Sequence, residues 1–119
     1  LHYHLFTLQA LAPLIRIAEA NGYGLSLQGE AALGRLASLT ATSVRDPDRM
    51  AAIAGMRQAH ILEAPGLSET AHYLRDGHGL EVIQGRLRNP ELERLPAPHR
   101  AFRETRMGGN ITRLWGGRA

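Results

Sequence analysis

The hydrophobic positions at the start of the chain repeat with the period of an α-helix. Apolar residues recur three or four positions apart at Leu1, Leu5, Leu8, Ala12, Ile15 and Ala18. Leu11 and Leu14 widen this stripe, which is typical of a helix that packs on more than one neighbour. A kink is expected at Pro13, because proline removes a backbone donor and crowds the preceding turn. The pattern predicts a helix over residues 1–20, which Asn21–Gly22 ends with a left-handed stop.

Two further helices are expected in the middle of the chain. After a glycine-rich loop, one is predicted from Glu30 to Val44. Its inner side is expected to carry Leu33, Leu36, Leu39 and Thr40. Asp46 followed by Pro47 is a typical helix start, with the aspartate as N-cap and the proline at the first helical position. The short helix after it is expected to carry Met50, Ile53 and Ala54, and its C-terminal bound is left open at Met56.

The second half of the chain shows three more helical segments before its character changes. Ser68 can cap a segment from Glu69 to Arg75, and a stretch from Leu80 to Arg88 follows two glycines. Asn89–Pro90 repeats the cap-then-proline signal before Glu91–Leu95.

The C-terminal end carries a different pattern. Met107–Asn110 is a turn signal, and the next five residues alternate as Ile111, Thr112, Arg113, Leu114 and Trp115. This alternation predicts a short strand or an extended tail that lies on the helical body. The whole pattern predicts an all-α chain in one domain with an extended C-terminal tail.

Composition narrows the classes of function. The 119 residues include 14 basic and 11 acidic side chains, a formal charge of +3, and every basic residue is arginine. A basic excess suits an anionic partner such as an acidic polysaccharide, a nucleic acid or a membrane surface, although solvated arginines explain the count equally well. The absence of cysteine excludes disulfides and thiolate nucleophiles. No apolar run approaches the roughly 20 residues that span a bilayer, so no membrane partner is expected.

Metal and carboxylate chemistry find little support. His2 and His4 form a pair, but two residues apart on a helix they point about 200° away from each other. His60, His72, His78 and His99 lack the spacing of a helical zinc site, so no metal site is expected. Two carboxylate pairs, Asp76 with Glu81 and Glu91 with Glu93, are interpreted as solvated helix ends rather than catalytic acids.

A nucleic-acid interface is a weaker hypothesis. Arg45, Arg49 and Arg57 lie around the short third helix, but the other arginines are spread through the whole chain. No tight helix–turn–helix spacing accompanies them.

Three stretches resemble a known family. Leu1–Leu11 with Ile17–Gly22, then Gly29–Leu36, then Phe102–Leu114 are similar, in this order, to the C-terminal part of the periplasmic alginate lyases, the poly(β-D-mannuronate) lyases of polysaccharide lyase family five. The tyrosine–histidine opening and the Gly-Gly-Asn-Ile-Thr-Arg ending are the most specific parts of the resemblance.

The resemblance implies a fold and an activity. Residues 1–119 would form the C-terminal portion of an (α/α) toroid of antiparallel helices, whose N-terminal portion is absent. The family binds an acidic uronate polymer and cleaves it by β-elimination, which leaves a 4,5-unsaturated sugar and needs no metal or other cofactor. Its tyrosine, which takes the C5 proton and protonates the leaving oxygen, matches Tyr3. The family also implies a periplasmic location.

The remaining site residues are less well defined. Arg106 and Arg113 are proposed from their charge to face a uronate carboxylate. The asparagine, histidine and arginine that neutralise the substrate carboxylate in the family lie upstream of the residue that matches Leu1. The chain is therefore expected to be catalytically incomplete, and its first helix is expected to expose an apolar face. Two alternatives are a non-catalytic helical module that binds an anionic polysaccharide and a small nucleic-acid-binding domain.

Overall fold

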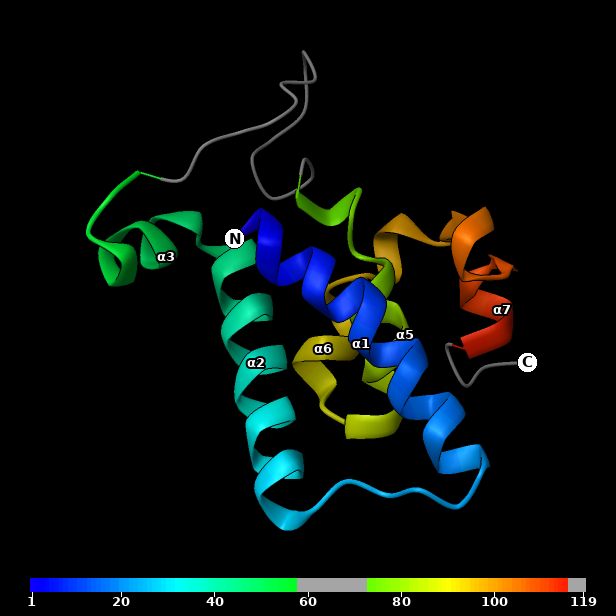
Figure 1. The fold of residues 1–119 in the computed structure, drawn as a ribbon. Coiled ribbons are helices and arrows are strands. Elements are labelled where there is room, and N and C mark those ends of the chain that lie inside the picture. Colours follow the sequence, from blue (N-terminus) through cyan, green and yellow to red (C-terminus); the bar gives the residue numbers. More distant parts are fainter. Residues whose placement is uncertain (58–72, 116–119) are drawn as a thin grey trace.

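The computed structural model describes residues 1–57 and 73–115, most of which are helical (Figure 1). The first half contains α1 (His2–Ala20), α2 (Leu27–Arg45) and α3 (Pro47–Ala54). The second half contains α5 (His78–Leu87), α6 (Pro90–Arg94) and α7 (Ile111–Trp115), with a short 3₁₀ turn at Ala97–His99. The helical content confirms the all-α prediction. None of the helices described is long and apolar enough to cross a membrane.

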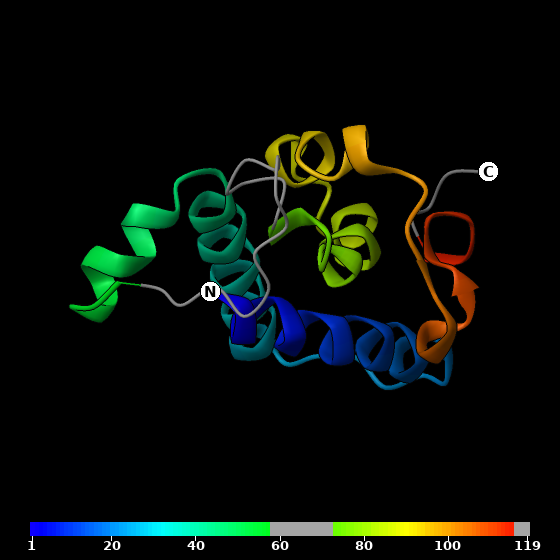
Figure 2. The same cartoon turned by 90° about the horizontal axis from the view of Figure 1, so that it is seen from above.

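Helix α5 lies at the centre of the fold. It contacts α1, α2, α6 and α7, and these helices surround it in the view from above (Figure 2). Every residue from 78 to 84 is buried, whichever side of the helix it occupies. A helix that is buried all round is a core element rather than an amphipathic surface helix. Helices α1, α2, α6 and α7 are therefore arranged around α5.

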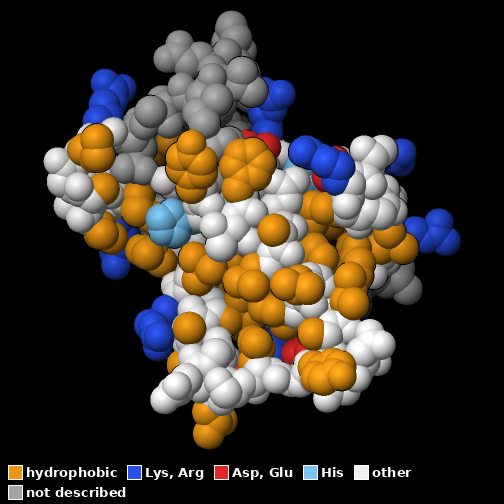
Figure 3. Space-filling view, in the orientation of Figure 1, with side chains coloured by type: hydrophobic (Ala, Val, Ile, Leu, Met, Phe, Trp, Pro, Cys, Tyr) orange, Lys and Arg blue, Asp and Glu red, His pale blue; other side chains and the backbone are white. Residues whose placement is uncertain are grey.

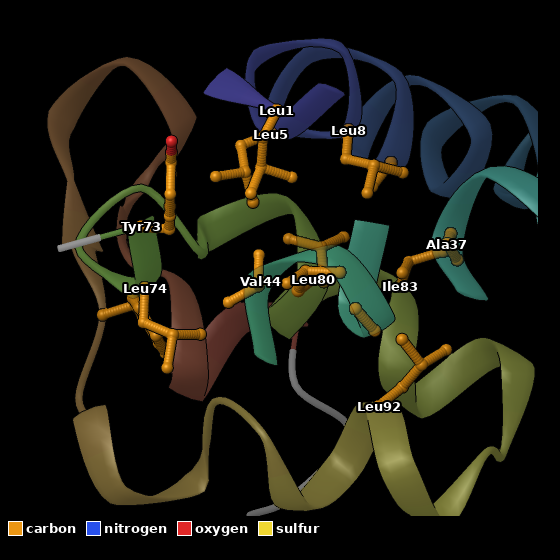
Figure 4. Packing of buried hydrophobic residues seen from close by; sticks show 14 of the residues in the cluster. Leu1, Leu5, Leu8, Ala37, Val44, Tyr73, Leu74, Leu80, Ile83 and Leu92 are labelled. Atoms are coloured by element: carbon orange, nitrogen blue, oxygen red, sulfur yellow. The ribbon is translucent and has the colours of Figure 1, made fainter. Parts of the chain in front are cut away.

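The core forms where α1 lies across α5. Leu5 and Leu8 of α1 point toward Leu80 and Ile83 of α5, and all four side chains are buried (Figure 4). The two helices approach closely because α5 has a glycine at position 79. A β-carbon at Gly79 would lie 2.3 Å from the main-chain carbonyl carbon of Leu8.

The boundaries of α1 and α2 follow the local signals in the sequence. α1 continues through Pro13 to Ala20. Gly22 after it has a φ of 84°, which confirms the predicted left-handed stop. α2 begins at Leu27, three residues before the predicted Glu30, because the Ser26 hydroxyl accepts a hydrogen bond from the Gly29 amide at 3.1 Å and caps the helix.

Helix α3 is only partly as predicted. Pro47 stands at its first position after Asp46, but the Asp46 side chain makes no capping hydrogen bond. α3 carries Met50, Ile53 and Ala54 as predicted, and Met56 lies beyond its end. Met50 is buried, whereas Ile53 is exposed. α3 packs mainly on α2, and a single neighbour covers only a narrow stripe. The predicted Ser68 cap and most of the segment after it lie outside the described residues.

Residues 111–115 form a helix, so the prediction of a strand or extended tail there was wrong. β1 (Arg103–Glu104) and β2 (Gly109–Asn110) form a two-stranded antiparallel ribbon around the 3₁₀ turn Thr105–Met107, and α7 follows directly. The Asn110 Oδ1 accepts a hydrogen bond from the Arg113 amide at 3.1 Å, which starts the helix. Ile111 is buried, and its amide donates to the Phe102 carbonyl at 2.9 Å. Capping and burial therefore outweigh the alternating pattern.

Candidate functional site

The candidate catalytic residue lies on the surface of the first helix. Tyr3 is in the first turn of α1, and it is 76% exposed. Its main-chain carbonyl accepts a hydrogen bond from the Thr7 hydroxyl at 2.8 Å, so the backbone beneath the ring is held in the helix. A ring presented in this way can reach a substrate that lies along the surface.

The residue next to Tyr3 does not add positive charge to its surroundings. Burial lowers the pKa of the His4 imidazole. The imidazole is therefore neutral at neutral pH.

The outer side of α1 is apolar as well as the inner side. The buried side carries Leu1, Leu5, Leu8, Ala12 and Ile15, whereas the exposed side carries Tyr3, Phe6, Leu14 and Ile17. At 100° per residue these two sets lie on opposite sides of the helix. Figure 3 shows hydrophobic side chains gathered over α1 on the face turned to the viewer. The exposed set, which we call the outer face of α1, confirms the expectation of an exposed apolar face on the first helix.

Arg106 does not present an unbalanced charge. Its Nε and Nη2 atoms donate to the Glu104 carboxylate at 3.1 and 3.2 Å, and its amide donates to the same group. The hydrogen bonds from the Arg106 side chain and amide lower the pKa of Glu104 to about 2. Arg106 and Glu104 therefore form a charge-balanced pair at neutral pH.

Arg113 and Arg106 are not close to Tyr3. Arg113 is exposed on α7, which packs against α5 and β1. Figures 1 and 2 both place α7 and the N-terminus on opposite sides of the molecule. The two arginines thus share one region near the ribbon, and Tyr3 lies in another. Their proposed contact with a uronate stays a prediction.

One of the carboxylates interpreted as solvated is fully buried. The Glu81 carboxylate accepts hydrogen bonds from the Arg100 Nε at 2.8 Å and from its Nη2 at 3.2 Å. The interpretation of Glu81 as part of a solvated helix end was therefore wrong, because α5 is surrounded on all sides. Glu91 is exposed and pairs with Arg45 at 3.1 Å. Glu81 and Glu91 thus each form an ion pair with an arginine from another part of the chain.

A cluster that the sequence did not reveal joins three helices. Arg86 of α5 donates to Glu19 of α1 at 2.7 Å and to Glu30 of α2 at 2.9 Å. The hydrogen bond from Arg86 lowers the pKa of Glu30, and Glu30 in turn raises the pKa of Arg86. No local spacing links these residues, because 56 positions separate Glu30 from Arg86. The cluster fixes α1 and α2 against the central helix.

Within residues 1–57 and 73–115 the structure brings together no group of three histidines or carboxylates that could hold a metal ion. His60 and His72 lie outside the described residues.

Comparison with known proteins extends the resemblance found in the sequence. Residues 1–50 match the family model described as alginate lyase, and this range includes α1, α2 and Tyr3. A curated alginate lyase of Azotobacter chroococcum mcd 1 is 31% identical over 115 residues, which cover 97% of this chain and 29% of that protein. No solved structure matches the chain. The chain thus spans less than a third of the length of the curated relative, and the two matches confirm that it resembles a part of an alginate lyase.

Proposed function

We propose that this chain is part of a polysaccharide lyase that cleaves alginate by β-elimination, with Tyr3 as the catalytic base and acid. The observation that carries the proposal is the similarity to an alginate lyase along nearly the whole chain. The exposed position of Tyr3 at the start of α1 supports its role, since a base must reach the C5 proton of a bound polymer.

The chemistry requires more than a tyrosine. Removal of the C5 proton from a uronate adds negative charge to the adjacent carboxylate, which becomes an aci-carboxylate. The proton is therefore acidic only when positive or hydrogen-bonding groups neutralise that carboxylate. A base then removes the proton, and an acid protonates the glycosidic oxygen as the bond to C4 breaks. In the proposal the Tyr3 phenolate takes the C5 proton, and the phenol so formed gives a proton to the leaving oxygen.

The neutralising groups are assigned to another portion of the fold. The described surface around Tyr3 offers a neutral His4, while Arg106 and Arg113 lie on the other side of the molecule. We propose that an N-terminal portion of an (α/α) toroid supplies these groups and packs on the outer face of α1. A charge-free apolar face opposite the buried face of the same helix suits such a contact. A periplasmic location goes with this proposal.

The test measures the unsaturated product by its ultraviolet absorbance on polymannuronate. A longer protein that joins this sequence to the preceding portion of the fold is expected to form the product. Tyr3→Phe is expected to abolish turnover while leaving substrate binding intact, because only the hydroxyl is lost. Tyr23→Phe is the matched control, since Tyr23 is 73% exposed in the loop after α1 and is expected to have no effect.

Two outcomes would contradict the proposal. Unchanged turnover in Tyr3→Phe would remove the tyrosine from the reaction. Binding of alginate without any product, in the presence of the preceding portion, would instead favour a non-catalytic module for anionic polysaccharides.

A further inference from the structure

The β1–β2 ribbon lines an open surface pocket that the proposed reaction does not use. Five residues line it, namely Arg103, Glu104, Thr105, Gly109 and Asn110, and its volume is about 410 Å³. This volume lies in the range of small-ligand sites. Gly109 has a φ of 95°, and no atom lies within 4 Å of where its β-carbon would be, so the space beside its α-carbon is open.

The register of the ribbon places two hydrogen-bond donors side by side. Arg103 is directly opposite Asn110 in the antiparallel pair, so their side chains emerge on the same face. The Asn110 Oδ1 accepts a hydrogen bond from the Arg113 amide, and the Asn110 Nδ2 donates none within the described part of the chain. The Arg103 guanidinium forms no hydrogen bond or ion pair within the described part of the chain, and it is exposed. A planar guanidinium beside an amide suits a carboxylate with a neighbouring hydroxyl.

The charge around the pocket favours an anion. Residues 103–113 contain three arginines and one glutamate, which gives a net charge of +2. The Arg106 guanidinium already balances the Glu104 carboxylate, so the glutamate does not repel an anionic ligand from Arg103. The unbalanced positive charge of residues 103–113 therefore lies on Arg103 in β1 and on Arg113 in α7.

We propose that the β1–β2 ribbon is a binding subsite for a single acidic sugar of the polymer. The Arg103 guanidinium binds the sugar carboxylate as a fork, while the Asn110 Nδ2 and the Thr105 hydroxyl bind ring hydroxyls. The choice of a uronate rests on the proposed function, and the subsite lies apart from Tyr3. It would hold the polymer at a distance from the bond that is cleaved.

The test is a titration of the ¹⁵N-labelled chain with a short oligomannuronate, followed by nuclear magnetic resonance at low salt. The amide signals of Gly109 and Asn110 are expected to move. Arg103→Gln is expected to weaken binding about tenfold, as the loss of one charge-assisted contact does. Arg35→Gln is the matched control, because it removes the same charge from an arginine that is exposed on α2 and forms no ion pair within the described residues. An unchanged spectrum outside the ribbon shows that both variants keep the fold.

The comparison ligands separate a sugar site from simpler binding. A neutral mannose oligosaccharide is expected to leave the ribbon signals unmoved, and acetate is expected to bind far more weakly than the oligomannuronate. Equal weakening by Arg103→Gln and Arg35→Gln, or equal binding of acetate, would overturn the proposal. Because this experiment measures binding alone, a chain that binds at the ribbon but belongs to an inactive protein would contradict only the proposed function. If Tyr3→Phe abolishes turnover but Arg103→Gln does not weaken oligomannuronate binding in the titration, only the subsite is contradicted.

Discussion

The contact between α1 and α5 depends on a glycine, and its replacement by alanine tests how the core is built. In Gly79→Ala the new methyl group would lie 2.3 Å from the Leu8 carbonyl carbon and 2.5 Å from the Gln9 amide nitrogen. Both atoms belong to the backbone of α1, so no side chain can rotate away from the clash. The two helices must therefore separate by more than about 1 Å for the carbons to reach the ordinary contact distance of roughly 3.5–4.0 Å.

That separation loosens the centre of the core. The buried side chains of Leu5 and Leu8 rest on Leu80 and Ile83, and a gap of 1 Å forfeits a quarter to a half of each dispersion contact. Overpacking of a well-packed core typically costs 1–3 kcal/mol, and the backbone position of this clash places it at the upper end. The higher helix propensity of alanine offsets at most about 1 kcal/mol. We expect the free energy of unfolding of Gly79→Ala to fall by about 2–3 kcal/mol.

The assay is urea denaturation followed by circular dichroism, with Gly34→Ala as the control. Gly34 lies within α2, and no atom lies within 4 Å of where its β-carbon would be. The same substitution there is expected to stabilise the chain by about 0.5–1 kcal/mol, because only helix propensity changes. Equal urea midpoints for the two variants would refute the close contact between α1 and α5.

Three further predictions concern charges and the outer face of α1. Glu81→Leu leaves the Arg100 guanidinium, whose side chain is 19% exposed, without its partner, and is expected to cost about 2–3 kcal/mol by urea denaturation. The double variant with Arg100→Met is expected to regain most of this loss, and a further loss would contradict the ion-pair explanation. Glu104 has a pKa of about 2 in the folded chain against an ordinary value of 4.5, so its contribution is present above pH 4.5 and disappears as the pH falls toward 2. In Glu104→Gln, stability measured across that range is therefore expected to fall less steeply, and an unchanged slope would exclude the pairing. Leu14→Glu is expected to leave the stability of this chain unchanged, since Leu14 is 62% exposed, but to destabilise the longer protein in thermal unfolding.

The sequence predicted elements well where a local signal decides the structure. The period of α1, the stop at Gly22 and the Asn89 cap of α6 follow from neighbouring residues alone, and the structure has all three. The five alternating residues at 111–115 are too few to distinguish a strand from a helix. The hydrogen bond from the Arg113 amide to the Asn110 side chain favours the helix there. The central place of α5 could not be predicted, because Gly79 weakens a helical pattern and its packing role depends on α1.

The candidate site divides in the same way. Tyr3 came from the resemblance, not from its spacing, and its exposure on α1 depends only on which side of that helix is buried. The state of the charged residues depends on partners far along the chain. Glu81 was predicted to be solvated, but Arg100, 19 positions away, pairs with it in the fold. Nothing in the sequence marked Arg86, because its partners Glu19 and Glu30 lie on α1 and α2. The sequence gives the number of charged side chains, but only the fold shows which of them are paired with an opposite charge.

The outer face of α1 has to serve two purposes under the proposed function, and its length allows both. From Tyr3 to Ile17 it extends about 21 Å at the rise of an α-helix, whereas a helix with its side chains is about 10 Å across. A single crossing helix can therefore cover Leu14 and Ile17 and still leave Tyr3 beyond its edge. The tyrosine would then stand at the rim of the contact, where a polymer can reach it, while the apolar residues behind it are excluded from water. A partner helix that buried the whole face would also bury the catalytic hydroxyl, so the proposed reaction requires the contact to lie toward the C-terminal end of α1.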